Sequence, residues 1–344
     1  MSNIIGKPNV LKQVNLSVVR KAIKERGSAT RAEIVKDTKI SVTTVRTLLT
    51  EMLFNNEITD AGYDKSIGGR KATRYALNKE RFFGVALCLG SEEVRYITVN
   101  ICGEIQESGS FETAGDGLVA IFAFLDNLFA RLEIKSIGIG VPGVVSGMGY
   151  QKGTDDGTFE HYPIGEVIGE RYGVPVILEN DLNAITLGFG RCFLKSFPEE
   201  RCDNLHMAYI HFDNKCVSAG FLSGGKILRG WNNFSGELGL FPISDNKALD
   251  SVFTELLSDA EYSQIVMRIM AGICCVLNPE YIAIGGSGFR KACLPLITEC
   301  FNSVLPDRMS AEIVYAEDIW HDYFGGMAYL TAEQIFANVM LIKE

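Results

Sequence analysis

The feature that most constrains the fold is the repeated alternation of strand-like and helix-like segments across residues 81–344. Apolar, strand-like runs include RFFGVALCLG (81–90), SIGIGVPGVVS (136–146) and PEYIAIGGSG (279–288), and helical runs such as GLVAIFAFLDNLFARL (117–132) lie between them. Such alternation is typical of layered α/β proteins. Two similar strand pairs open near residues 82 and 207. They predict a duplicated fold with two lobes.

The first 80 residues differ from the rest in charge. They hold nine lysines and six arginines against eight acidic residues, a net charge of +7, whereas residues 81–344 carry a net charge of −16. A basic segment attached to an acidic body indicates that the segment, and not the body, meets a polyanion.

Two helical patterns begin this basic segment. NLSVVRKAIKER (15–26) opens at the cap-like Asn15 and stops at Gly27, a common residue at helix ends. Its apolar face is predicted to hold Val18, Val19, Ala22 and Ile23. The second pattern has Thr30 and, three residues later, Glu33, which is the spacing of a capping box.

A third helical pattern begins at Ser41, after the short turn KIS. Its apolar residues recur at helical spacing: Val42, Val45, Leu48, Leu49, Met52 and Leu53. The opposite face then holds Thr43, Thr44, Arg46, Thr47 and Thr50. Short hydroxyl side chains with one arginine suit a helix in the major groove, and the spacing fits a helix-turn-helix. A plain three-helix interaction module with a basic surface is the alternative.

A two-stranded wing is expected to follow, from residues 57–64 through 71–78, with the basic tip KSIGGRK (65–71) suited to phosphate or minor-groove contact. We therefore predict a winged helix-turn-helix DNA-binding domain over residues 1–78. The candidate DNA-contacting residues are Arg31, Ser41, Thr43, Thr44, Arg46, Thr47, Arg70 and Lys71.

The bulk sequence indicates a cytoplasmic protein. No apolar stretch of about 20 residues is apparent, so we expect no transmembrane helix and no membrane partner. The N-terminus lacks the pattern of a signal peptide. The nine cysteines show neither CxxC nor CxC spacing, which favours reduced thiols over disulfides or a metal site.

The stretch LENDLNAITLG (178–188) places two acids and two amides within five residues, before a helix rich in small residues. Such a cluster is suited to binding a polyol. Asn180 or Asp181 can equally be a helix cap, whose side chain accepts a backbone N–H bond. Both roles are compatible, with one residue capping the helix and the other facing a ligand.

Several motifs together resemble the ROK family (repressor, open reading frame, kinase): GVPG, ENDLNA, RGWNNFSGELG and LNPEYIAIGGSG, preceded by the winged helix. The resemblance implies an α/β, two-lobed, actin-like sugar-kinase (ribonuclease H-like) fold. Lobe 1 is expected at 79–185, with the C-terminal helix 321–344 returning to it, and lobe 2 with the dimerisation surface at 186–320. Regulator members of the family bind operator DNA and respond to a sugar or sugar phosphate.

By this resemblance, Asp181 occupies the place of the catalytic aspartate of ROK kinases, with Asn180 beside it. Gly143 and Glu237 are further ligand-binding candidates, although Glu237 is equally a solvated loop acid. Trp231 can stack on a sugar face or pack. The loop in which the family often has a sugar-contacting Asn offers only Asp155, Asp156 and His161.

The phosphate-binding turns of the kinases are not retained. Ala86 stands where the family has an acid, Cys88 where it has a glycine, and Glu92 and Glu93 follow. In the second turn Asn214, Cys216 and Ser218 replace glycines, and Gly220 alone is kept. Side chains there block the approach of backbone to phosphate. We therefore expect no catalytic residue, no ATP and no cofactor, while the retained AIGGSG is expected to be a strand-to-helix turn.

The family's zinc motif is absent as well, since Leu240 occupies the place of its histidine and no cysteine is near. The leading hypothesis is therefore a dimeric or higher-order DNA-binding regulator, most often a repressor in this family, that controls carbohydrate uptake or metabolism genes through a sugar or sugar phosphate. The alternatives are an active sugar kinase and a regulator controlled by a protein partner without a sugar.

Overall fold

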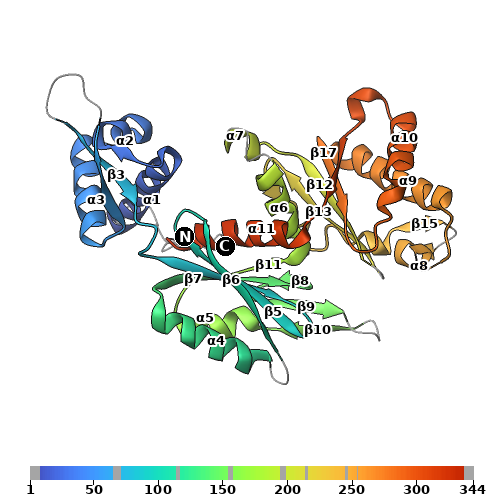
Figure 1. Cartoon of the computed structure of the whole chain (residues 1–344), viewed down its shortest axis with the longest axis horizontal. Coiled ribbons are helices and arrows are strands. Elements are labelled where there is room, and N and C mark those ends of the chain that lie inside the picture. Colours follow the sequence, from blue (N-terminus) through green and yellow to red (C-terminus); the bar gives the residue numbers. More distant parts are fainter. Residues whose placement is uncertain are drawn as a thin grey trace, which may run out of the picture.

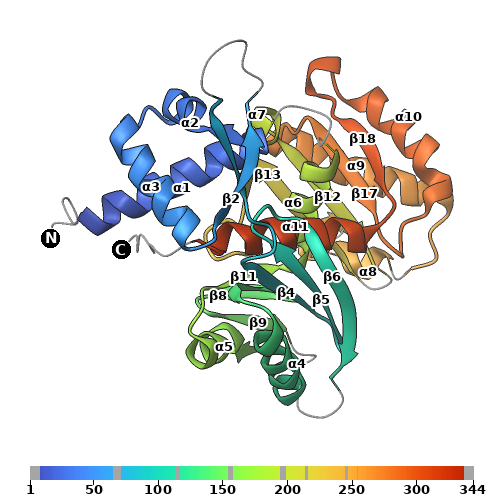
Figure 2. The same cartoon turned by 60° about the vertical axis from the view of Figure 1, so that its left-hand side comes forward.

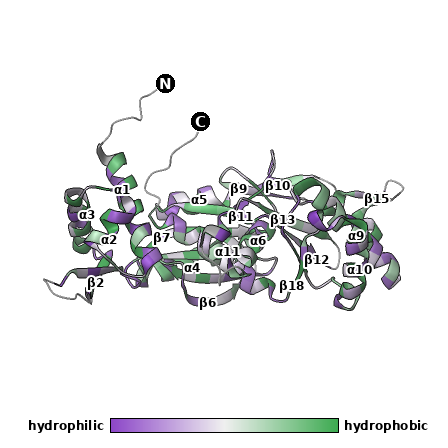
Figure 3. Cartoon of the chain, turned by 90° about the horizontal axis from the view of Figure 1, so that it is seen from above, coloured by the Kyte–Doolittle hydropathy of each residue, from purple (hydrophilic) through white to green (hydrophobic). Residues whose placement is uncertain are grey.

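The computed structural model describes residues 8–64, 71–113, 117–153, 158–193, 199–213, 216–244, 247–253 and 255–336. Their helices and strands form an N-terminal unit and two lobes, with helices α6 (Asp181–Phe193) and α11 (Ile319–Gln334) lying between the lobes (Figure 1). Seen from above, the three groups lie in a row, with the N-terminal unit at one end (Figure 3).

The N-terminal unit has the elements that the sequence predicts. Helices α1 (Pro8–Arg26), α2 (Arg31–Thr38) and α3 (Val42–Phe54) pack beside a sheet with strand order β1 (Ala29–Thr30), β3 (Thr73–Leu77) and β2 (Ile58–Tyr63). The predicted capping box is present: the Glu33 amide donates to the Thr30 hydroxyl, and the Thr30 amide donates to the Glu33 carboxylate at 2.7 Å.

Two details of α1 correct the sequence analysis. The helix begins at Pro8 rather than Asn15. Residues 9–14 contain neither glycine nor proline, and a cap residue favours a helix start without requiring one. Val18 lies off the buried face with 38% of its surface exposed, whereas Val19 and Ile23 are fully buried.

Lobe 1 is built on a five-stranded sheet with the order β11 (Val176–Asn180), β7 (Ile134–Val141), β4 (Phe83–Leu89), β5 (Glu93–Asn100) and β6 (Ile105–Glu112). Side chains alternate between its faces along each strand. Leu87 of β4 faces α4 (Gly117–Arg131) and α5 (Ile164–Tyr172), and its neighbours Ala86 and Cys88 belong to the core around α6 and α11.

Lobe 2 repeats this sheet. Its order is β14 (Lys226–Ile227), β13 (Val217–Ser223), β12 (Met207–Phe212), β17 (Tyr281–Gly285) and β18 (Glu312–Ala316). In both lobes an antiparallel run of three strands continues into two parallel strands. Helices α9 (Asp259–Leu277) and α10 (Leu294–Val304) cover its outer face (Figure 2). The predicted duplication is confirmed.

The sequence analysis expected one strand over residues 136–146, but the structure has two. The run divides at Pro142 and Gly143 into β7 and β8 (Val144–Ser146), and β8 belongs to a small sheet with β9 (Gly149–Gly153) and β10 (Phe159–Tyr162). Proline has no N–H to continue the strand pairing. Short elements join lobe 2: α7 (Glu199–Cys202), β15 (Pro242–Ser244), β16 (Lys247–Ala248) and α8 (Leu249–Phe253).

The two central helices cross in direct backbone contact. A Cβ atom on Gly188 of α6 would lie 1.8 Å from the Asp322 carbonyl oxygen of α11, and one on Gly326 would lie 1.9 Å from the Ala184 carbonyl oxygen. Residues Leu182 to Gly190 of α6 are all buried. Glycine at the crossing therefore lets both sheets pack against one compact middle layer.

Helix α9 is long and apolar enough to cross a membrane by length and composition alone, which the sequence analysis did not anticipate. Its packing is that of a core helix. It begins with a capping box between Ser258 and Glu261, and Val266, Met270 and Ile273 are buried in the lobe 2 core. One such helix is weak evidence for a membrane protein, and we assign α9 to the core.

Candidate functional site

Asn180 caps helix α6 at the point where β11 ends. Its Oδ1 accepts the backbone N–H of Asn183 at 3.1 Å, and its Nδ2 donates to the Gly143 carbonyl at 3.1 Å and to Asp181 Oδ1 at 3.0 Å. Both amide hydrogens are thus engaged within the protein. Asn180 ties the helix to the turn after β7, and Gly143 takes part through its backbone.

Replacing Asn180 with alanine is expected to lower the free energy of unfolding by about 1–2 kcal/mol, because the cap bond and the link to Gly143 are both lost. Chemical denaturation of the two proteins measures the difference. Asn78→Ala, which also removes a side-chain amide bonded to a backbone carbonyl, is the control without a helix cap. Equal stability of Asn180→Ala and the wild type would contradict the capping role.

Asp181 keeps one oxygen available. Its Oδ1 accepts the Leu182 N–H at 2.8 Å and the Asn180 amide, while its Oδ2 has no hydrogen bond to another described residue. Burial raises the pKa of Asp181 to about 6, helped by the charge of Glu237 and opposed by the Leu182 and Asn180 hydrogen bonds. The free oxygen can accept a hydrogen bond from a ligand hydroxyl.

This pKa predicts a pH-dependent stability. A carboxyl whose pKa is higher in the folded than in the unfolded chain binds its proton more tightly when folded, so the stability it contributes is lost as the pH rises through about 6. The free energy of unfolding of Asp181→Asn, relative to that of the wild type, should therefore be higher at about pH 8 than at about pH 5. Urea denaturation at both pH values measures this change. A difference that does not change with pH would contradict the raised pKa.

Two further carboxylates lie near Asp181. Glu237 follows Gly236, whose φ is +103° and whose carbonyl accepts the Ala219 N–H at 2.8 Å. Asp250, in the first turn of α8, accepts the Val217 N–H at 2.8 Å. Partial burial, and then the charge of Asp250, raise the pKa of Glu237.

Asp250 was missed by the sequence analysis. It stands in the ordinary-looking run KALDS, and only folding places it beside Gly239, where an added Cβ would lie 2.1 Å from its Oδ2. With Asp181 and Glu237 it forms a group of three neighbouring carboxylates.

A segment of lobe 2 reaches across to lobe 1. Arg229 pairs with the buried Glu179 of β11, whose other oxygen accepts the Asn183 amide at 3.0 Å. The Asn233 amide donates to the Val145 carbonyl at 2.8 Å. Trp231, between these contacts, has 95% of its surface exposed. The charge of Arg229 is therefore already neutralised by Glu179.

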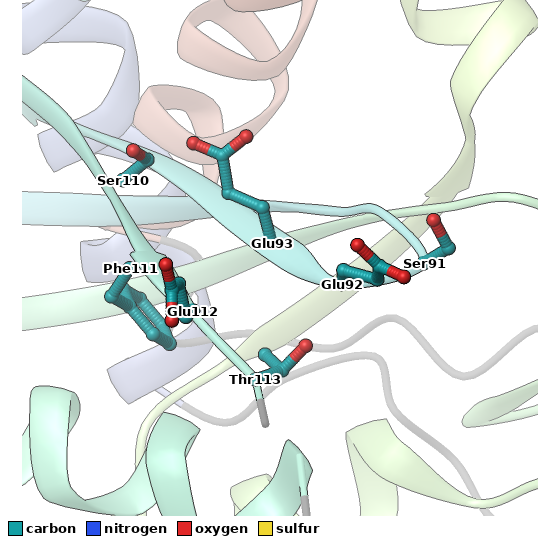
Figure 4. Close-up of a pocket in the computed structure, with 7 residues that line it drawn as sticks. All are labelled: Ser91, Glu92, Glu93, Ser110, Phe111, Glu112 and Thr113. Carbon is teal, nitrogen blue, oxygen red and sulfur yellow. The ribbon is translucent and has the colours of Figure 1, made fainter. Parts of the chain in front are cut away.

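The place of the first phosphate turn is filled. Cys88 is buried against the Tyr323 hydroxyl, and burial raises the pKa of its thiol to about 12. Beyond the β4–β5 turn, Glu92, Glu93 and Glu112 line an open hollow of about 1000 Å³ (Figure 4). A group of carboxylates repels phosphate.

The second turn has become a paired strand. Ser218 and Gly220 of β13 pair with His211 and Tyr209 of β12. A Cβ on Gly220 would lie 2.0 Å from the Thr186 hydroxyl oxygen of α6, so packing explains this glycine. The segment Ala283–Gly288 comprises the end of β17 and the expected turn after it, with Gly286 at φ +107°. Asn214 lies outside the described residues.

The remaining candidates are dispersed. Leu240 ends a short 3-10 helix and is 74% exposed, and within the described ranges no group of three or more His, Cys, Asp or Glu is arranged to hold a metal. His161 is exposed on β10, opposite Gln151. Asp155 and Asp156 lie outside the described residues.

Most of the candidate DNA-contacting residues that the structure describes lie on α3 or at its cap. Arg31 begins α2, and Thr43, Arg46 and Thr47 are exposed on α3. Ser41 caps α3 by accepting the Thr44 N–H at 3.2 Å. Lys71 is exposed just before β3, and Arg70 lies outside the described residues.

Paired sheets of equal topology around two crossing helices define an actin-like fold of the ROK sugar-kinase type. Residues 85–251 match the model of the ROK family, so the chain contains a ROK family domain. It is 28% identical over 256 residues to a putative xylose repressor of Caldicellulosiruptor sp. (strain Rt8B.4), an alignment over 70% of this chain and 62% of that protein.

Solved structures agree on the fold. A ROK family transcriptional regulator, a homologue of the E. coli MLC protein, superposes with a TM-score of 0.71 at 20% identity, over 95% of this chain and 97% of that one. A putative N-acetylmannosamine kinase from Listeria monocytogenes superposes with a TM-score of 0.56 at 16% identity, over 73% and 99%.

Proposed function

We propose that the protein is a sequence-specific DNA-binding regulator, acting as a repressor of carbohydrate genes in the cytoplasm, whose two-lobed body senses a sugar and transfers no phosphate. The observation that carries the proposal is the exposed face of α3, where hydroxyl side chains surround Arg46. We assign residues 1–78 to DNA binding, 79–185 with the C-terminal helix to lobe 1, and 186–320 to lobe 2 and dimerisation.

The N-terminal unit has the arrangement of a winged helix-turn-helix. Helices α2 and α3 are joined by Lys39, Ile40 and Ser41, and Lys39 adopts the left-handed conformation at φ 60° that a tight turn requires. Strands β2 and β3 form the antiparallel wing beside them. In this arrangement α3 would be the recognition helix that enters the major groove.

Helix α11 provides a path from the proposed sugar cleft around Asp181 to the DNA-binding unit. At one end Tyr323 lies against Cys88 beside the cleft. Just beyond its other end, the Phe336 ring packs on Phe82 with a centroid distance of 5.9 Å, and the Arg20 guanidinium of α1 stacks 3.9 Å above the Phe336 ring. A change in the packing of α11 at the cleft therefore acts on α1, which is how ligand binding would alter DNA affinity.

The charges of the cleft favour an unphosphorylated sugar. A phosphoryl group beside Asp181, Glu237 and Asp250 meets three carboxylates, and each close pair of like charges costs about 4 kcal/mol at about 4 Å and an effective dielectric constant of about 20. Hydroxyl groups, in contrast, donate well to carboxylates.

We expect one sugar of a panel containing xylose, glucose and N-acetylglucosamine to raise the melting temperature, since a ligand that binds only the folded state stabilises it. For a hexose, its 6-phosphate should bind at least about tenfold more weakly. Asp181→Ala should remove the shift. Asn232→Ala serves as the matched control, because Asn232 is exposed in the same segment and makes no hydrogen bond to another described residue. Tighter binding of the phosphate would contradict the charge argument.

The regulatory function is tested by a gel shift on the promoter beside the protein's own gene, with unrelated DNA of equal length as competitor. Specific binding that the sugar weakens supports the proposal. Absence of specific binding at any salt concentration would overturn it. ATP consumption with a sugar, abolished by Asp181→Asn, would instead identify an active kinase.

A further inference from the structure

Lobe 1 contains a second cavity, on the face of its sheet that is opposite to Asp181. It has a volume of about 480 Å³ and lies beyond the carboxyl ends of β4 and β7, at Leu89 and Pro142. Ligands of α/β proteins bind most often at this end of parallel strands, and cavities of about 300–1,000 Å³ hold small molecules.

The sheet separates this cavity from the candidate sugar cleft. Leu89 follows Leu87 by two residues and shares its face, which packs under α4 and α5. Cys88 lies between them and points to Tyr323, and the charge of Asp181 contributes to the raised pKa of its thiol. A molecule in the cavity therefore contacts a different set of side chains from a sugar at Asp181.

The walls of the cavity are apolar and partly aromatic. Aliphatic side chains come from the sheet and both helices, namely Val94, Ile121, Ile164 and Val167. Tyr150 and Tyr162 of the small sheet stack on each other, with ring centroids 5.0 Å apart and planes 17° apart. Such a stacked pair presents a flat surface to a further ring.

A few polar groups give the cavity an orientation. The Tyr150 hydroxyl has no hydrogen bond to another described residue, whereas the Tyr162 hydroxyl donates to Glu160 at 2.5 Å. Lys152 is the one cation among the lining residues described, and it is exposed at the edge. Ser91 and Thr113 add hydroxyls.

We propose that this cavity is a binding site for a small planar aromatic acid, whose ring lies on the tyrosine pair among the aliphatic side chains and whose carboxylate meets Lys152 and the Tyr150 hydroxyl. The inference is independent of the sugar-sensing function, because the two sites lie on opposite faces of the sheet. The protein would then bind a second small-molecule ligand in addition to a sugar.

The test uses 2-naphthoate as the probe and isothermal titration calorimetry on the full chain. Binding is expected, and the saturated analogue decahydro-2-naphthoate should bind at least about tenfold more weakly because it cannot stack. Val167→Trp, which fills the cavity, should remove binding. Val119→Trp, also on a helix of this face but 62% exposed and outside the cavity, is the matched control and should bind as the wild type does.

Lys152→Ala provides a variant that leaves the core untouched. It should weaken 2-naphthoate about tenfold and abolish the preference for 2-naphthoate over the uncharged 2-naphthamide. The proposal is overturned if 2-naphthoate fails to bind at millimolar concentration, if it binds Val167→Trp as tightly as the wild type, or if Lys152→Ala keeps the preference. A sugar-induced melting shift is read separately, so failure here leaves the regulatory function standing.

Discussion

Replacing Arg46 with alanine is expected to weaken specific DNA binding by about 1–3 kcal/mol, roughly ten- to a hundredfold, without altering the fold. The Thr47 and Thr50 hydroxyls donate to backbone carbonyls of α3 at 3.1 and 3.0 Å, and Ser41 shares its hydroxyl with Thr43 and Thr44. Four of these five hydroxyl hydrogens are thus engaged within the helix and its cap. Arg46, which is exposed and makes no ion pair among the described residues, remains as the strong donor of this face.

Fluorescence anisotropy on the promoter fragment measures the loss. Arg268→Ala is the matched control, because Arg268 is an exposed arginine of α9 at the far end of the molecule and its removal changes the net charge equally. An equal loss for both variants would mean that only overall charge matters, and unchanged binding of Arg46→Ala would remove α3 as the reading helix.

The second large effect is expected at the crossing of the central helices. Gly188→Ala should lower the free energy of unfolding by about 2–3 kcal/mol or prevent folding, because overpacking of backbone against backbone cannot be relieved by a side chain. The new Cβ would meet the Asp322 carbonyl oxygen at 1.8 Å and the Gly326 nitrogen at 2.5 Å. The helices would have to separate, and both sheets pack against them.

Gly272→Ala is the control for this substitution. Gly272 also lies within a helix, α9, but an added Cβ there meets nothing within 4 Å. Since alanine is the better helix former, this variant should be more stable than the wild type by up to about 1 kcal/mol. Urea denaturation of both variants measures the contrast. Similar changes in the free energy of unfolding at the two positions would show that helix propensity, and not the helix crossing, determines the effect of Gly188→Ala.

The duplicated sheets were predictable because buried strands read as apolar runs and their order repeats along the chain. Leu87 and Ile139, for example, sit in strands that are covered on both faces, so the runs around them are nearly continuous. The third helix was predictable for a related reason. One face must be buried, and Val45, Leu48, Leu49 and Met52 recur at the helical period.

The start of α1 and the division of 136–146 were not predictable in this way. The cap-like Asn15 favoured a helix start at that residue, but the helix extends further toward the N-terminus and begins at Pro8. At Pro142 the chain leaves one sheet and enters another. The second sheet forms only because β8 pairs with β9, which in turn pairs with β10, and the sequences of β9 and β10 show only a weak strand pattern.

The residues around Asp181 show the same limit of prediction from local sequence. The local sequence left open whether Asn180 or Asp181 caps the helix, and the structure divides the roles: Asn180 has both amide hydrogens engaged, while Asp181 keeps Oδ2 available. Asp250 and Arg229 reach the cleft only through long-range folding, so no local pattern marks them. The ligand roles of Asp181 and Glu237 stay predictions.

The measurement that tests the account most directly is an anisotropy titration of the full chain against the promoter beside its gene, with and without the sugar that raises its melting temperature. The account predicts tight binding that survives excess unrelated DNA and weakens when the sugar is added. Binding that unrelated DNA competes away equally, at every salt concentration, would contradict it.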